Sequence, residues 1–563
     1  MGALMSFLRF FLPHAVVFLF MSAASHAFPV DEELRRDQGS VLELQTQLND
    51  LGMNAGRPDG LFGPRTQRAI EAFARRFPSA VETGLHGEMV ARIERVHHGR
   101  FGNPFVGIPL VYDGPSGRTI AVTNVREDPG GCASCNTVSL ILATGDLTGD
   151  GIDEIITSDH LADSRFRLVN QTSPLRIFSP DGRNSEVQLA HGEMPRRIHE
   201  REAVIADFNG DGKQDLFIVA HGHDAHPFPG EQNVLLLSSA EGLIDASMTH
   251  LPRLNDMAHG VAAGDINGNG HTDLLIITNE GAANLIPYVL LNDGTGRFEY
   301  TEIDSVLDRA LVDFRPRNRR HRAQFSTARL IDMNGNGFLD LLLLARGEDA
   351  ERAGRFRGTR HSLLIYNDGT GKFPNTNIVE LPTDRWGLAT FTNDATAVDL
   401  DGDGNLDLLL TQSTRHPGIG AWYGHYLQVL MNENGTFVDR TAERLWPQGY
   451  PHMEGLNFAD KTRLVDLTGN GHLDIVTSTL SPNYRRSMDE AAIIVGINDG
   501  TGHFQPASPR WIDRRGHSAR QMIPGTFSRG RRPGIAAYNL NGRYGQGPDE
   551  TFGMLLRVYE FQR

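Results

Sequence analysis

The sequence predicts a mainly β protein, with a small three-helix domain at residues 40–96 and a seven-bladed β-propeller at residues 104–563. Two observations predict the propeller. Six segments share one Asp-rich template flanked by apolar runs, and they start at Asp146, Asp207, Asp265, Asp332, Asp399 and Asp466. Successive starts lie 61, 58, 67, 67 and 67 residues apart, which is the period of a repeated structural module.

The template is Asp-x-(Asn/Asp/Thr)-Gly-(Asp/Asn)-Gly-x-x-(Asp/Glu), and its spacing suits calcium. Ca²⁺ prefers six or more oxygen ligands, and a tight loop presents side chains one, three and five to one ion. Glycines at positions four and six let the backbone fold around the ion, residue seven offers its carbonyl, and the acid at position nine closes the shell. We therefore expect up to six Ca²⁺ ions.

The candidate ligands follow from this template. They are Asp146, Thr148, Asp150 and Glu154; Asp207, Asn209, Asp211, the Lys213 carbonyl and Asp215; Asp265, Asn267, Asn269 and Asp273; Asp332, Asn334, Asn336 and Asp340; Asp399, Asp401, Asp403, the Asn405 carbonyl and Asp407; and Asp466, Thr468, Asn470 and Asp474. The fifth loop has four Asp side chains, so we expect it to bind most tightly.

The EF-hand shares the opening of this template, but it needs a Glu at position twelve and helices on both sides. Position twelve here is Thr157, Ile218, Ile276, Leu343, Leu410 and Thr477. The loops also continue into short apolar runs typical of buried strands, such as 341–344. The EF-hand is therefore excluded.

A second turn follows several loops. Asn-Asp-Gly-Thr-Gly-x-Phe occurs at 292–298, 367–373 and 498–504, with a weaker copy at 432–437, and Asp-Gly between apolar runs indicates a hairpin. Each module thus holds four strands, the content of one propeller blade. The segment 527–535 fits the template without its acids and predicts a seventh blade. The stretch 109–125 should join the C-terminal strands and close the ring.

These segments resemble FG-GAP/VCBS repeats, which form the blades of the integrin α-subunit propeller and of many bacterial envelope proteins. The resemblance covers residues 104–563, and it implies a calcium-binding β-propeller.

The N-terminal module has a helical pattern. Val41, Leu44, Leu48 and Leu51 give one apolar face, a turn occupies 57–64, and Thr66 is expected to cap a second helix that carries Ala69, Ile70 and Phe73. A third helix is expected at 88–94. Leu44-Gln45, Gly52, Asp59-Gly60-Leu61-Phe62-Gly63 and Thr66 resemble the peptidoglycan-binding three-helix domain, which implies attachment to the cell wall.

Residues 1–27 are typical of a secretory signal, with Arg9, an apolar stretch at 10–21 and a small-x-small site ending at Ala27. The alternative is a membrane anchor, but the stretch is short and Pro13 and His14 interrupt it. Residues 28–39 form a linker. We expect a secreted, periplasmic or cell-wall-associated protein whose mature form has no transmembrane segment.

The two cysteines, Cys132 and Cys135, are expected to form a local disulfide in an exported protein. A redox motif would need a helix beside the pair, and zinc would need two further ligands.

The net charge of −15 argues against nucleic acid as a partner. Arg, His and aromatic residues gather in loops expected on the blade face opposite the calcium loops. The candidates for ligand binding are His221, His223, Arg319, Arg320, Arg357, Arg360, His416, Trp422, Tyr423 and Arg485. Arg binds carboxylates and phosphates and aromatic rings stack on sugars, so an anionic polysaccharide or a protein partner is the hypothesis. The alternative is that these loops are merely solvated.

Together these features predict an exported, calcium-stabilised propeller that is held near peptidoglycan and binds an envelope or extracellular glycan without catalysis, as an adhesion module does. The alternative is a polysaccharide lyase or other glycan-cleaving enzyme that uses the Arg/His-rich face. The loop 221–231, with three histidines and two acids, could serve zinc or acid–base chemistry.

Overall fold

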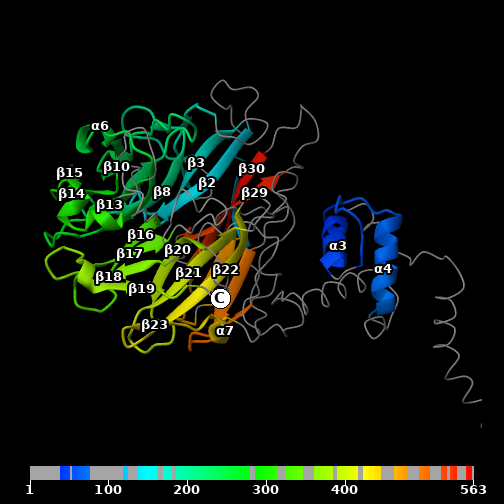
Figure 1. Ribbon diagram of the computed structural model, residues 1–563. Coiled ribbons are helices and arrows are strands. Elements are labelled where there is room, and N and C mark those ends of the chain that lie inside the picture. Colours follow the sequence, from blue (N-terminus) through cyan, green and yellow to red (C-terminus); the bar gives the residue numbers. More distant parts are fainter. Residues whose placement is uncertain are drawn as a thin grey trace, which may run out of the picture. The chain divides into compact units, whose positions relative to one another are not determined.

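The structure is a computed structural model, and the chain divides into two compact units, Met1–Gly107 and Ile108–Arg563 (Figure 1). Each unit is described by itself. The structure describes residues 38–50, 53–76, 118–124, 136–162, 169–180, 185–278, 286–312, 325–345, 361–383, 390–415, 422–445, 462–468, 470–478, 493–506, 522–528, 533–541 and 553–560. The signal segment, the third helix expected at 88–94 and both cysteines lie outside these ranges.

The N-terminal unit contains two described helices, α3 (Gln38–Asp50) and α4 (Pro64–Arg76). Their apolar faces meet as the periodicity predicts, with Val41, Leu48 and Phe73 fully buried. The expectation for Thr66 was wrong, because α4 already begins at Pro64, whose fixed φ suits the first helical position. Thr66 is instead buried within α4 and accepts a hydrogen bond from the Gln45 side chain.

The second unit is a β-propeller. Within the described residues, six of its blades are antiparallel sheets of four strands. Their strands are β2 (Asn136–Gly145), β3 (Glu154–Ala162), β5 (Arg176–Ser179) and β6 (Ser185–Glu186) in blade 1; β8 (Glu200–Ala206), β9 (Asp215–Ala220), β10 (Val234–Ser239) and β11 (Gly242–Asp245) in blade 2; β12 (Ala258–Gly264), β13 (Asp273–Thr278), β14 (Tyr288–Asn292) and β15 (Phe298–Glu302) in blade 3; β16 (Phe325–Ile331), β17 (Asp340–Ala345), β18 (Leu363–Ile365) and β19 (Ile378–Glu380) in blade 4; β20 (Thr390–Val398), β21 (Asp407–Arg415), β22 (Trp422–Glu433) and β23 (Thr436–Asp439) in blade 5; and β24 (Thr462–Val465), β25 (Asp474–Ser478), β26 (Ile493–Asn498) and β27 (Phe504–Pro506) in blade 6.

Short elements connect these sheets. They are the strand pair β4 (Ser173–Pro174) and β7 (Arg196–Arg197), the helices α6 (Ser247–His250) and α7 (Thr441–Arg444), and the 3-10 turns η2 (Ile303–Ser305), η3 (Arg309–Leu311) and η5 (Asn375–Asn377).

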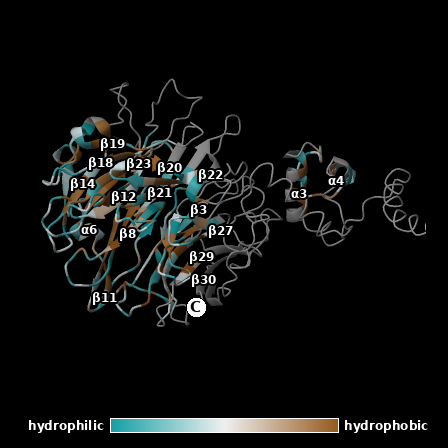
Figure 2. Cartoon of the chain, turned by 90° about the horizontal axis from the view of Figure 1, so that it is seen from below, coloured by the Kyte–Doolittle hydropathy of each residue, from teal (hydrophilic) through white to brown (hydrophobic). Residues whose placement is uncertain are grey.

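The core lies between neighbouring blades. One apolar cluster joins blades 3 and 4 through side chains such as Leu275 and Leu341, and equivalent clusters join blades 1 and 2, 2 and 3, and 4 and 5. The middle strands are apolar on both faces because each sheet is covered on both sides; every residue of β9, β13 and β17 is buried. Figure 2 shows the apolar residues gathered on the strands.

A seventh four-stranded sheet combines the two ends of this unit. It consists of β28 (Met522–Thr526), β29 (Pro533–Asn541), β30 (Gly553–Glu560) and β1 (Arg118–Asn124), in the order β1-β30-β29-β28. β1 pairs antiparallel with β30, so the early strand does join the C-terminal strands as expected. β28 contacts β2 of blade 1 and β24 of blade 6.

No helix in the described residues is long and apolar enough to cross a membrane.

Candidate metal loops and a histidine cluster

Each Asp-rich loop joins the first and second strands of its blade and is held by its own first residue. In blade 2 the backbone N–H groups of Gly210 and Gly212 donate to opposite oxygens of the Asp207 carboxylate, at 2.7 and 2.8 Å. Gly210 and Gly212 have φ values of 74° and 83°, a region that only glycine enters without strain. The same N–H donation to the first Asp recurs in all six loops.

The acid at position nine of the template is buried and holds two backbone segments together. Asp215 begins β9 and is fully buried, and its two oxygens accept the N–H groups of Phe208 at 2.8 Å and Ser238 at 2.7 Å. It therefore fastens the loop to the third strand of its blade. Asp273, Asp340, Asp407 and Asp474 repeat this arrangement. Burial raises the pKa of Asp215 to about 6 and that of Glu154 to about 7.

The sequence interpretation missed a second residue of this framework, the Asn that opens each Asn-Asp-Gly turn and its weaker copy at 432–437. Asn292 is buried, receives Gly294 N–H on its side-chain oxygen, and donates to the carbonyls of Phe208 and Thr272 at 2.8 and 3.1 Å. Because Phe208 belongs to the loop of blade 2, this amide couples neighbouring blades. Recurrence of Asn at 292, 367, 432 and 498 was the available signal.

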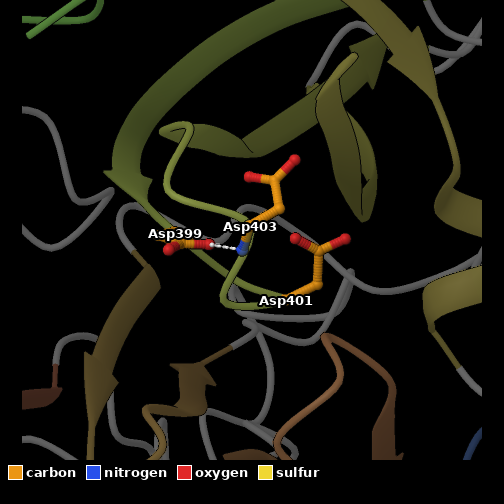
Figure 3. Close-up of side chains that lie close together, drawn as sticks. All are labelled: Asp399, Asp401 and Asp403. Carbon is orange, nitrogen blue, oxygen red and sulfur yellow. Dashed lines mark hydrogen bonds between the residues drawn. The ribbon is translucent and has the colours of Figure 1, made fainter. Parts of the chain in front are cut away.

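The fifth loop brings three carboxylates together. Oxygens of Asp399, Asp401 and Asp403 lie within 4.8 Å of one another (Figure 3). Arg444 from α7 donates to one Asp401 oxygen at 3.0 Å, while the other Asp401 oxygen is buried and has no hydrogen-bond partner among the described residues. Among the described residues, these three Asp side chains are the one set of at least three His, Cys, Asp or Glu residues whose ligand atoms lie close enough to share an ion.

The ten ligand-face candidates fall into three sets. Arg319, Arg320, Arg357, Arg360, His416 and Arg485 lie outside the described residues. Trp422 and Tyr423 begin β22 and pair in register with Arg415 and Thr414, at the end of blade 5 opposite its Asp-rich loop. His223 is partly exposed, and His221 is buried.

His221 belongs to a cluster that the sequence did not reveal. We define the histidine cluster as His160, His199, His221 and His259, whose consecutive ring centroids are 4.4, 5.1 and 4.6 Å apart. His160 comes from β3, His199 and His221 flank β8 and β9, and His259 is in β12, so three blades contribute. All four lie at the strand ends far from the Asp-rich loops. Arg201 precedes Asp207 by six positions along β8, which is roughly 20 Å of extended strand.

Arg201 joins two of these rings. Its guanidinium contacts His199 Nε2 at 3.4 Å and His259 Nδ1 at 3.2 Å. A guanidinium can only donate, so these two nitrogens accept, and each ring carries its proton on the other nitrogen. That assignment leaves a proton on His199 Nδ1, a buried atom that has no hydrogen-bond partner in the part of the chain that the structure describes. Burial, followed by neighbouring His160 and Arg201, lowers the pKa of His199 well below its usual value, so the ring is neutral.

The loop that supplies His221 is closed tightly. His221 N–H donates to the His199 carbonyl at 2.7 Å, and the backbones of Glu231 and Asp256 pair in both directions. A Cβ on Gly230, which has φ 70°, would lie 2.6 Å from the Asp256 carbonyl carbon. The loop is thus a rigid connection, and among described residues its histidines form no three-ligand metal group.

An ion chain links the first strands of four blades. Arg329 in β16 bonds Glu202 in β8 at 3.0 Å and also Asp394 in β20, and Arg463 in β24 bonds Asp394 at 2.6 Å. Glu202 further accepts the Thr327 hydroxyl at 2.7 Å. Glu202 follows Arg201 directly in the sequence, so this series of ion pairs begins next to the histidine cluster.

Comparison with known proteins agrees with this architecture. A family model described as FG-GAP-like repeat matches residues 207–276 and 332–410, and a peptidoglycan binding domain model matches residues 37–84. No curated protein sequence matches the chain.

Solved structures also match. The Dos1 propeller is 12% identical with a TM-score of 0.32, covering 80% of this chain and 96% of its own. A thermostable family-43 glycoside hydrolase is 11% identical with a TM-score of 0.27, covering 54% of this chain and 90% of its own. The two family models and the sheet order together show that the chain carries FG-GAP-like repeats within a β-propeller, with a match to the peptidoglycan binding domain ahead of them.

Proposed function

We propose that the protein is exported, attaches to peptidoglycan through its N-terminal module, and uses a calcium-stabilised propeller to bind a glycan of the envelope or surroundings without cleaving it. One observation carries the proposal: a peptidoglycan binding domain match and FG-GAP-like repeats occur on one chain. The signal at 1–27, the linker at 28–39, the Cys132–Cys135 disulfide and the third helix of the N-terminal module belong to this proposal.

The N-terminal module supports attachment through an exposed turn that its core holds in place. The Gln45 side chain accepts the N–H groups of Asp59 and Gly60 at 2.9 and 3.0 Å and donates to the Leu61 carbonyl at 3.0 Å. Leu61 itself is 59% exposed. A fixed turn that presents an apolar side chain to solvent offers a surface for a sugar ring.

Co-sedimentation of the full mature chain with purified peptidoglycan tests the anchor. We expect Leu61→Ser to weaken retention several-fold and Met248→Ser, which removes an exposed apolar side chain of the propeller, to leave it unchanged. Retention of the wild type no greater than that of an unrelated propeller would refute attachment.

The loops fit Ca²⁺ on the grounds of donor chemistry. The Asp399, Asp401 and Asp403 carboxylates converge, and one buried Asp401 oxygen finds no hydrogen-bond partner within the described ranges. Carboxylate, amide and carbonyl oxygens are the ligands that calcium prefers. In a position-nine acid such as Asp215, Oδ2 accepts the N–H groups of Phe208 and Asn209, whereas Oδ1 accepts that of Ser238, so that a second lone pair on Oδ1 can serve a cation. A bound ion would neutralise the loop and tie the first two strands together.

Calcium removal therefore has a defined expected effect. Dialysis against EDTA should lower the melting temperature, because a ligand that binds only the folded state stabilises it by mass action. Asp403→Asn should lower the bound calcium, measured by elemental analysis, by one ion per chain, whereas Asp304→Asn on the surface should not. An unchanged melting temperature together with calcium-free protein would rule out the calcium role.

We also infer that the seventh sheet is a degenerate seventh blade that closes the ring. Its strand β28 contacts blades 1 and 6, and Thr526 and Asp153 exchange hydrogen bonds at 2.8 and 2.6 Å. Ring closure would leave no open sheet edge between the first and last blades.

A glycan-cleaving enzyme is the second candidate, and the histidine cluster favours it. The cluster gathers neutral imidazoles, which can act as bases, beside an arginine that can neutralise a uronate carboxylate. Release of oligosaccharide products from acidic polysaccharides, lost in His259→Gln, would replace the binding proposal with this one.

A further inference from the structure

We propose that the histidine cluster and Arg201 form the glycan-binding site of the propeller, and that this site recognises an oxyanion, a carboxylate or phosphoryl group, carried by the glycan. The inference rests on the proposed glycan-binding function and assigns it to particular residues. The cluster is assembled from three blades, and its members are far apart in sequence.

The geometry excludes a metal as the occupant. His199 Nε2 and His259 Nδ1 direct their lone pairs at a guanidinium, so these nitrogens are not available to a cation. Arg201 adds a permanent positive charge beside the same rings. In the described part of the chain, no three of these rings present nitrogens within 4.8 Å of one another.

The same groups suit an anion. Arg201 is exposed, and a planar guanidinium binds carboxylate and phosphate oxygens through paired N–H donors. His259 is partly exposed, and its proton lies on Nε2, the nitrogen that faces away from Arg201. His199 Nδ1 is a buried donor without an acceptor among the described residues, so the ring is oriented by its Nε2 contact with Arg201.

Two carboxyl groups, Glu200 and Glu202, lie beside the histidine cluster, and their environments limit the negative charge that they bring to the site. Glu200 is fully buried behind the rings, where it accepts the Ser158 hydroxyl at 2.7 Å, and burial raises its pKa to about 7. Its charge is therefore reduced at neutral pH. Glu202 is already bonded to Arg329 in the ion chain. The two acids nearest to Arg201 in the sequence are thus each engaged by another residue, Glu200 by Ser158 and Glu202 by Arg329.

Titration calorimetry on the full mature protein in calcium buffer tests the proposal. The probes are an oligogalacturonate, a phosphorylated oligomannose and a neutral oligosaccharide of equal length. We expect an acidic probe to bind and the neutral probe not to bind, and the stronger of the two acidic probes identifies the oxyanion. Arg201→Gln should weaken that binding roughly tenfold or more, whereas Arg253→Gln, an exposed arginine between the same blades, should change it less than about twofold.

Equal binding by Arg201→Gln and wild type would overturn the inference, as would equal losses in both arginine variants. His259→Gln gives a second measurement if Arg201→Gln fails to fold, and it should also weaken acidic binding. Failure of all three probes to bind, with peptidoglycan retention intact, would refute this site while leaving the anchor proposal standing. Loss of retention alone would refute the anchor and not the site.

Discussion

At the scale of single residues, buried side-chain amides hold the repeated loops in place. Asn292 satisfies two carbonyls and one N–H in a region that water does not reach. Its Phe208 contact crosses from blade 3 to blade 2, so one side chain stabilises both a hairpin and a neighbouring loop.

Replacement of Asn292 by Ala should therefore be costly. The variant leaves two buried carbonyls and one N–H without partners, and we expect a loss of about 2–4 kcal/mol in the free energy of unfolding. Urea denaturation measures it. Asn375→Ala, at an exposed position in η5, should have little effect, and equal losses in the two variants would contradict the coupling role.

A buried acid sets a pH dependence at the same scale. Asp256 is 1% exposed, accepts the Tyr288 hydroxyl at 2.5 Å, and burial raises its pKa to about 7 from the usual 3.8. The folded state therefore favours the protonated acid. Its contribution to stability is complete below about pH 4 and is lost as the pH rises through about 7.

Asp256→Asn should remove this dependence. A shift of about three units corresponds to about 4 kcal/mol, so the variant should exceed the wild type in stability near about pH 8 by up to that amount and match it near about pH 4. Urea unfolding across this range gives the comparison. The surface variant Asp304→Asn should keep the wild-type pH profile, and a wild-type profile in Asp256→Asn would show that burial does not control this group.

At the scale of elements, local patterns predicted most of what the structure contains. Each Asp-rich loop joins two strands, and each Asn-Asp-Gly turn joins two more, because glycine positions and apolar runs act within a few residues. The histidine cluster was not predictable this way. His160, His199 and His259 meet only when three sheets pack, and no spacing in the sequence encodes that approach.

Predictions also failed where a local signal had two meanings. Thr66 looked like a helix cap because Thr is favoured at that position, but Pro64 begins α4 and the threonine serves Gln45 instead. The sequence shows that the Thr66 hydroxyl lies near the start of a helix. Its hydrogen-bond partner, Gln45, comes from α3 and depends on how the two helices pack.

The ion chain shows how first strands of separate blades depend on one another. Arg329 is the cation between Glu202 and Asp394, and both carboxylates are buried. Arg329→Met should destabilise the protein by about 3 kcal/mol, because two buried acids lose their shared counter-ion. Arg440→Met, which removes a surface pair with Glu433, should leave the urea midpoint nearly unchanged. A midpoint as high in Arg329→Met as in wild type would show that the chain contributes nothing net.

At the scale of the whole molecule, the first strands make contacts in one continuous order. β2, β8, β12, β16, β20, β24 and β28 each contact the next, and β28 returns to β2. Residues at the two ends of the propeller unit therefore share one sheet, in which Val558 of β30 lies opposite Ala121 of β1 and Ala536 of β29. If this sheet closes the ring, damage to it should weaken every blade rather than one edge.

Val558→Pro tests that coupling, because proline removes the backbone donor from a strand that is paired on both sides. We expect the whole cooperative unfolding transition to move to lower temperature, with a loss of about 2–3 kcal/mol, because under the proposed closure the ring opens when this sheet fails. Val558→Thr keeps both the N–H group and a β-branched side chain, so it should remain close to the wild type. Calorimetry that shows an unchanged main transition, beside rapid proteolysis of the C-terminal strands alone, would mean that six blades stand without closure.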